Sequence, residues 1–197
     1  MIAIIDYGAG NLRSVQNTLA EIGAAYRLAH TPDQLRAASK IILPGVGHFG
    51  QMIRALEMMR LREPILRNIN DGVPFLGICL GLQALFESSE EAPGLKGLGL
   101  VPGVVKRFSH ELRVPHMGWN EIAPRDDASL VKNLGPRPYL YFAHSYYCPV
   151  VDATAATCEY GVPYTAVLER QNLFGVQFHP EKSGPLGLRI VKNFVDL

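Results

Sequence analysis

Residues 74–83 read Pro-Phe-Leu-Gly-Ile-Cys-Leu-Gly-Leu-Gln, an apolar run that ends in Gly-x-Cys-x-Gly and leads into a helical pattern. We expect a buried strand that stops, turns sharply and presents Cys79 at the start of a helix. Small residues on both sides permit the strained turn of a nucleophile elbow. The positive end of the helix beneath Cys79 would favour the thiolate over the thiol. On this stretch alone, a nucleophile and a buried structural cysteine between two turn-forming glycines are equally good interpretations.

The regions before this stretch alternate between buried strands and helical patterns, which indicates a parallel sheet covered by helices on both faces. The apolar run 2–5 is followed by a helix with Leu12, Val15, Leu19 and Ile22 on one face. Other strands are predicted at 25–28 and 40–43, and helices from Thr31, over 49–59 and over 64–69. Because active sites lie beyond the carboxyl ends of such strands, the turn Pro44–Gly47 is expected to face Cys79.

The glycine turn at 8–11 invites comparison with a dinucleotide-binding loop. The third glycine of that fingerprint would fall at Arg13, so the pattern fails. We interpret the glycines as turn formers and Asn11 as a helix cap.

From about Gly97 the pattern changes to short β-like segments, which favour antiparallel pairing. These are 103–108, 114–122, 139–147, 153–160, 164–169 and 173–178, before a last helix that carries Leu188, Val191, Phe194 and Val195. The predicted fold class is therefore α/β: a mostly parallel central sheet with helices on both faces and an added antiparallel β portion in the second half.

Length and composition are those of an ordinary globular chain, with 197 residues, 48% hydrophobic and 19% charged. We expect a single domain over 1–197. The formal charge of +1 gives no reason to expect nucleic acid or membrane as a partner. No apolar run is long enough to span a membrane, and the first residues lack the features of a signal peptide. The three cysteines, Cys79, Cys148 and Cys158, fit neither a disulfide framework nor a metal site, so a cytoplasmic location is the simplest expectation.

His179 and Glu181 end the last predicted strand and lie two apart, so both side chains can face one site. A cysteine nucleophile needs a base, and the base needs an acceptor on its other ring nitrogen. Cys79, His179 and Glu181 supply these three roles. The alternative is an exposed histidine and glutamate at a strand end. Since 100 residues separate Cys79 from His179, only the fold can bring them together.

Three segments, 44–47 (Pro-Gly-Val-Gly), 77–83 (Gly-Ile-Cys-Leu-Gly-Leu-Gln) and 177–183 (Gln-Phe-His-Pro-Glu-Lys-Ser), together resemble class I, triad-type glutamine amidotransferases. Segments 6–11, 115–120 and 142–147 further resemble the glutaminase subunits of imidazole glycerol phosphate synthases. The resemblance spans nearly the whole chain in order and shows no departure at the triad. It implies hydrolysis of glutamine to glutamate and ammonia through a Cys79 thioester, without a cofactor.

The resemblance also implies the residues that surround the reacting cysteine. Oxyanion donors are expected from Leu80 N–H and from Val46 or Gly47, in a turn whose glycines would let a peptide flip and act as a switch. The alternative for that turn is an ordinary strand-ending turn. The glutamine-binding residues implied are Gly45, Gln83, His144, Ser145 and Tyr146. Alternatively, Gln83 merely caps the pocket and Tyr146 is a core aromatic residue.

The implied partner is a (β/α)8-barrel cyclase subunit that consumes the ammonia within a heterodimer. The chain itself has no phosphate loop that would suggest its own synthase chemistry. Interface residues implied by the resemblance are Gly10, Asn11, His116, Met117, Gly118, Trp119, Asn120 and Lys182. Trp119 suits an interface anchor, and plain core packing is the alternative.

Three other functions stay open at this point. The chain could serve another class I synthase (anthranilate, carbamoyl phosphate, nucleotide or pyridoxal phosphate), or be a non-catalytic regulatory module with the same fold. A thiol hydrolase or peptidase with the same elbow is the third. The segments 6–11 and 116–120 argue against the first, and the retained triad residues argue against the second.

Overall fold

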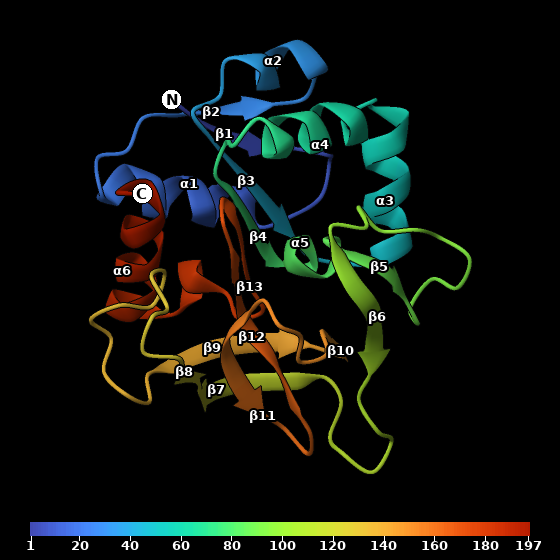
Figure 1. Ribbon diagram of the computed structural model, residues 1–197, viewed down its shortest axis with the longest axis vertical. Helices are drawn as coiled ribbons and strands as arrows, with labels where there is room; N and C mark the ends of the chain where they lie inside the picture. The colour runs from blue at the N-terminus through green and yellow to red at the C-terminus, as the bar shows by residue number, and fades with distance from the viewer.

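A computed structural model describes residues 1–197, and it is built around an eight-stranded sheet (Figure 1). The strand order is β2-β1-β3-β4-β13-β12-β11-β8, in which the neighbours from β2 to β13 run parallel and the rest antiparallel. The strands are β1 (Ile2–Ile5), β2 (Tyr26–Ala29), β3 (Lys40–Gly45), β4 (Phe75–Cys79), β8 (Ala123–Pro124), β11 (Thr154–Glu159), β12 (Pro163–Arg170) and β13 (Leu173–Val176). The predicted mixed α/β class is confirmed.

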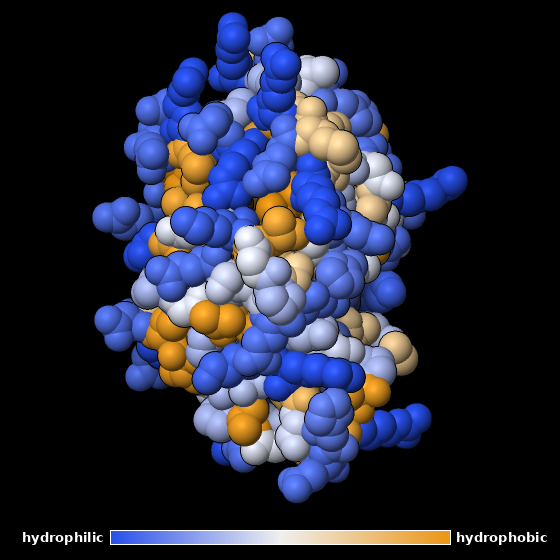
Figure 2. Space-filling model, turned by 90° about the vertical axis from the view of Figure 1, so that its right-hand side faces the viewer, coloured by the Kyte–Doolittle hydropathy of each residue, from blue (hydrophilic) through white to orange (hydrophobic).

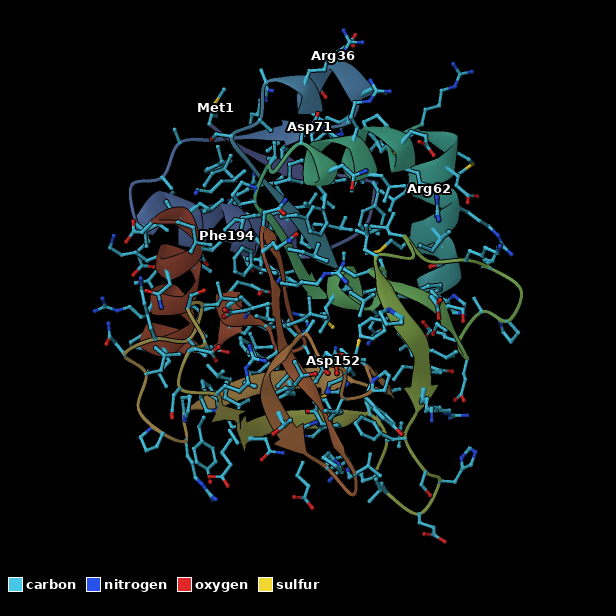
Figure 3. The ribbon with its side chains drawn as sticks, in the orientation of Figure 1. Met1, Arg36, Arg62, Asp71, Asp152 and Phe194 are labelled. Atoms are coloured by element: carbon cyan, nitrogen blue, oxygen red, sulfur yellow. The ribbon has the colours of Figure 1, made fainter.

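Helices cover both faces of the parallel part, as the alternation along the chain predicts. Ile4 and Ile42 face a core shared with α1 and α6, whereas Ile5 and Leu43 face a second core shared with α2, α3 and α4. Phe194 of α6 is fully buried between that helix and the sheet (Figure 3). The helices are α1 (Leu12–Glu21), α2 (Pro32–Arg36), α3 (Phe49–Met58), α4 (Arg62–Asn70), α5 (Leu80–Gln83) and α6 (Gly184–Val195).

Two smaller sheets stand beside the main one. The first has the order β10-β6-β5 and the second pairs β7 with β9. Their strands are β5 (Phe86–Ser89), β6 (Val101–Arg107), β7 (His116–Glu121), β9 (Tyr139–His144) and β10 (Tyr146–Tyr147). β5 was not predicted, and the segment expected as one strand over 139–147 is divided between β9 and β10.

The strand β13 is an exception to the antiparallel pairing that the second half favours. It lies between β4 and β12 and runs parallel to β4, with Val176 paired with Ile78. All four of its residues are buried, as in a strand covered on both faces. Its continuous apolar sequence, rather than an alternating one, was the available sign of this position. The insertion brings the chain after Val176 to the same edge of the sheet as Cys79.

The helix expected after Cys79 is present but short. α5 has four residues, so it is a single turn and has no developed helix dipole. The expected stabilisation of a thiolate by a helix N-terminus therefore lacks a structural basis. Asn11 occupies the N-cap position of α1 as predicted, but its side chain caps no backbone N–H.

None of the helices is both long and apolar enough to cross a membrane. Figure 2 shows the side of the molecule that carries α3, β5 and β6, where hydrophilic residues predominate and apolar residues form separate areas.

Candidate active site

The turn at Cys79 has the strained geometry that the sequence predicts. Cys79 has φ +53° and ψ −106°, a region that residues other than glycine rarely adopt and that costs about 1–3 kcal/mol. A β-carbon on Gly81 would collide with the backbone oxygen of Leu43, and one on Gly77 would collide with the backbone of Gly81. The glycines therefore allow β4 to pass directly into α5 against β3. This tight packing holds the sulfur at the carboxyl edge of the sheet.

The side chains of His179 and Glu181 form a buried pair at the end of β13. His179 Nδ1 lies 2.9 Å from Glu181 Oε1, and the two side chains are 3% and 2% exposed. The backbone of His179 is held by Tyr141, whose carbonyl accepts its N–H at 2.8 Å, and by Ser183, whose hydroxyl donates to its carbonyl. The alternative of an exposed histidine and glutamate is excluded.

The charges around His179 favour its protonated form. Burial by itself lowers the pKa of an imidazole, but the neighbouring Cys79 sulfur and Glu181 carboxylate outweigh it and raise the pKa of His179 to about 10. At neutral pH this arrangement corresponds to an imidazolium that lies between the Cys79 sulfur and the Glu181 carboxylate. The ring is thus ready to donate a proton next to Cys79.

Cys79 and His179 line one pocket of about 190 Å³. The pocket also includes all three oxyanion candidates and four of the five glutamine-binding candidates: Val46, Gly47, Leu80, Gln83, His144, Ser145 and Tyr146. The fifth, Gly45, is not among the lining residues. It is paired with Cys79 in the β3–β4 register, and a β-carbon there would collide with Leu80. The turn at 44–47 therefore faces the elbow, as predicted.

Three residues that the sequence analysis did not identify lie at this site. Glu91 lines the pocket and accepts the Phe49 N–H at 2.7 Å. Gln177 is fully buried, and its Nε2 lies 3.6 Å from Cys79 Sγ. Burial raises the pKa of Tyr7 to about 12, opposed in part by the Val46 backbone, although Tyr7 Oη has no partner in hydrogen-bonding geometry. Of the three, only Gln177 had a sign in the sequence, as a polar residue in a buried strand end.

Most of the expected interface residues surround a second, larger concavity, here called the Trp119 groove. It has a volume of about 600 Å³ and is lined by Arg113, Pro115, His116, Met117, Gly118, Trp119, Asn120 and Tyr160. Met117 is 65% exposed and Trp119 is 56% exposed, so core packing of Trp119 is excluded. Pro115 and Met117 also line the Cys79 pocket, which places the groove directly beside it.

The other three expected interface residues lie outside this groove. Asn11 reaches the triad from the side of α1, with Nδ2 3.5 Å from Glu181 Oε1, and Gly10 precedes it in a turn with φ +125°. Lys182 is exposed and its Nζ lies 5.7 Å from the centre of the Tyr141 ring. No three His, Cys, Asp or Glu side chains converge on a common metal position.

Comparison with known proteins identifies the family. The family described as glutamine amidotransferase class-I matches residues 3–197. Imidazole glycerol phosphate synthase subunit HisH of Methanothermobacter thermautotrophicus is 50% identical over 198 residues, which cover 100% of this chain and 98% of that protein. The same subunit of Deinococcus radiodurans is 46% identical over 197 residues, with 98% and 92% covered. PurLQS from Thermotoga maritima has the same fold, with a TM-score of 0.79 at 19% identity over 99% of this chain and 97% of that one.

The chain therefore belongs to the class-I glutamine amidotransferases, in the family of imidazole glycerol phosphate synthase subunit HisH. The resemblance drawn from the sequence motifs is confirmed.

Proposed function

We propose that the chain hydrolyses glutamine to glutamate and ammonia and delivers the ammonia to a (β/α)8-barrel cyclase subunit. The cyclase would use it to make imidazole glycerol phosphate in histidine biosynthesis, within a heterodimer. One observation carries the proposal: the strained Cys79 lines one pocket of amino-acid size together with His179, which the buried Glu181 holds. The names of the relatives support the choice of this synthase over other class I synthases.

The reaction begins with attack of the Cys79 thiolate on the amide carbon of the glutamine side chain. A carbon–sulfur bond forms and the carbonyl electrons move to oxygen, which becomes negatively charged. Leu80 N–H and an N–H from Val46 or Gly47 would stabilise that oxyanion, and losing one such donor costs about 3 kcal/mol. The hypothesis that the 44–47 turn acts as a switch stays a prediction.

His179 would act first as an acid and then as a base. Next to the thiolate its imidazolium is favoured, so it can protonate the departing nitrogen as the carbon–nitrogen bond breaks. In the thioester the sulfur carries no charge, so it no longer stabilises the imidazolium. The neutral form of the His179 ring then becomes easier to reach. It can then take a proton from the water that releases glutamate. Glu181 would hold Nδ1–H and so present the other ring nitrogen to the reaction.

Recognition of the amino-acid end of glutamine would rest on other residues that line the pocket. Glu91 offers a carboxylate to the α-ammonium group, and Gln83 with the 144–146 segment would contact the rest of the substrate. Replacing Glu91 by Gln should raise KM for glutamine at least tenfold, with a smaller change in kcat. An unchanged KM in steady-state ammonia release would contradict this role.

The Trp119 groove is the candidate surface for the cyclase. It adjoins the Cys79 pocket through Pro115 and Met117, so a partner seated there would lie directly beside the reacting cysteine's pocket. Exposed Trp119 and Met117 are residue types enriched in interface cores. Gly10, Asn11 and Lys182 would extend the contact around the triad side of the molecule.

The same proposal includes a single domain and a cytoplasmic location. The continuous sheet, which draws strands from residues 2–5 and from residues 163–176, supports one domain. Three free, buried cysteines suit a reducing compartment.

The test is ammonia release by the full-length chain, with and without the cyclase subunit and its nucleotide ligand. Activity should require Cys79 and increase in the complex, so Cys79→Ala should abolish it. Cys148→Ala is the matched control, because Cys148 is also a buried free cysteine but does not line the pocket. Retained activity in Cys79→Ala, or an inactive wild-type complex, would refute the proposal.

A further inference from the structure

We propose that Gln177 is a hydrogen-bond donor that stabilises the Cys79 thiolate, and that the Tyr146 carbonyl, acting through the buried side chain of Gln83, orients its amide. The inference rests on the proposed function, in which Cys79 reacts as a thiolate. Gln177 is 0% exposed, and its Nε2 lies 3.6 Å from Cys79 Sγ, a normal hydrogen-bond length for the large sulfur atom.

The orientation of the Gln177 amide follows from the fixed chemistry of one backbone carbonyl. Tyr146 O can only accept hydrogen bonds, so the side-chain end of Gln83 that lies 2.9 Å from it must be the NH₂ group. That NH₂ also lies 3.2 Å from the Gln177 side chain and therefore donates to Oε1 of Gln177. The NH₂ of Gln177 is consequently the end that faces Cys79.

The same carbonyl organises a pair of histidines on its other side. His144 Nδ1 lies 2.8 Å from Tyr146 O and must carry the hydrogen, which leaves Nε2 of His144 as an acceptor. His116 Nδ1 lies 3.3 Å from that Nε2 and donates to it. The Tyr164 hydroxyl also lies 3.3 Å from His116 Nδ1. Nε2 of His116 then accepts from Asn120 Nδ2 at 3.4 Å. Both rings stay neutral because burial lowers their pKa values, to about 4 for His116 and about 3 for His144.

These contacts form one continuous route from the Trp119 groove to the nucleophile. Asn120 and His116 line the groove, His144 and Gln83 line the Cys79 pocket, and Gln177 connects Gln83 to the sulfur. The donors on the two sides converge on the Tyr146 carbonyl, which accepts from both His144 and Gln83. His144 donates to the Tyr146 carbonyl from the other side, whereas the Gln177 amide is oriented by that carbonyl through Gln83 alone.

A neutral donor is needed because Cys79 is only 6% exposed and has little contact with water. The titratable groups that interact electrostatically with it are His179, Tyr7, Cys148 and Tyr164. Burial raises the pKa of Tyr7, Cys148 and Tyr164, so these three are uncharged at neutral pH. Gln177 adds a donor that does not titrate and that persists when His179 gives up its proton.

The experiment measures alkylation of Cys79 by iodoacetamide as a function of pH in the full-length protein, with each cysteine followed by peptide mass spectrometry. Gln177→Met keeps the size of the side chain and removes the donor. Because the thiolate loses a stabilising partner, the midpoint of the alkylation profile should move up by about one pH unit. The midpoint does not depend on how easily the reagent enters, since entry changes only the plateau rate.

Two further variants complete the design. Gln83→Met removes the group that orients Gln177 and should shift the midpoint in the same direction by a smaller amount. Cys148→Ala is the matched control, since Cys148 Sγ contacts Gln177 through Oε1 at 4.0 Å, whereas the NH₂ end of Gln177 faces Cys79. Its midpoint should equal that of the wild type.

An unchanged midpoint in a folded Gln177→Met protein would overturn the inference. If circular dichroism shows that this variant does not fold, an unchanged midpoint in Gln83→Met has the same meaning. Failure of the proposed function is a different result: the wild type would then show no selective alkylation of Cys79 over Cys148 and Cys158.

Discussion

The buried histidine His116 makes a prediction about how stability depends on pH. Its ring is 5% exposed and stacks between Tyr160 and Phe142, with ring centres 4.1 and 5.1 Å away. Burial lowers its pKa from 6.5 in the unfolded chain to about 4 in the fold. Between these two values the unfolded chain binds more protons than the folded chain, so stability falls as the pH falls.

The size of the effect follows from the two pKa values. Going from about pH 7.5 to about pH 5, the unfolded His116 becomes almost fully protonated while the folded one stays mostly neutral, which costs about 2 kcal/mol. His116→Phe retains a ring for stacking and removes the titration. The variant should be less stable than the wild type at the higher pH, because His144 loses a hydrogen-bond partner, but it should lose about 2 kcal/mol less on acidification.

The assay is urea unfolding of wild type and variant at both pH values, followed by circular dichroism. Comparing the two losses removes the contribution of every group that they share, including His179 and the carboxylates. His110→Gln is the matched control, since His110 is exposed. This variant should lose the same free energy of unfolding as the wild type between the two pH values. Equal losses in wild type and His116→Phe would refute the reasoning, because His116 would then titrate as an ordinary histidine.

Three other predictions concern the triad, the elbow and the groove. Glu181→Gln should lower kcat for ammonia release in the complex by about 10²–10⁴ with little change in KM, because Glu181 holds His179 without lining the pocket; a KM effect alone would count against this role. Gly81→Ala should destabilise the fold by about 1–3 kcal/mol or more, because its β-carbon would meet the Leu43 carbonyl, and an unchanged thermal midpoint would contradict that. Trp119→Ala should weaken cyclase binding by about 2 kcal/mol in titration calorimetry without changing the circular dichroism spectrum, and unaltered affinity together with unaltered ammonia transfer would remove Trp119 from the interface.

Much of the fold could be predicted because its central strands are buried on both faces. β1, β3 and β4 read as continuous apolar runs, and their bounds lie within two residues of those expected. β13 was assigned to an antiparallel region because its neighbours in sequence pair that way. Its true neighbour, β4, is far away in the chain, and no local pattern encodes a pairing of that kind.

The residues of the site show the same difference between what local sequence encodes and what distant contacts decide. Cys79, His179 and Glu181 could be identified because their chemistry requires particular residue types at particular spacings. Gln177 cannot be singled out within its motif, because its role depends on which atoms it meets: Cys79 Sγ on one side and Gln83 on the other. The predicted stabilisation of the Cys79 thiolate by a helix dipole fails for a related reason. α5 ends after one turn, and its length depends on packing that the local sequence does not reveal.

The sequence by itself determined the residue types of the triad, the glycines that allow the turn at Cys79, and the family. These are local properties: a small side chain, a thiol, an imidazole and a carboxylate act through their own chemistry. Tertiary structure alone decided that His179 meets Cys79, through insertion of β13 beside β4. It also decided that His116 and His144 are neutral, because burial shifts a pKa only when other segments exclude water from the ring.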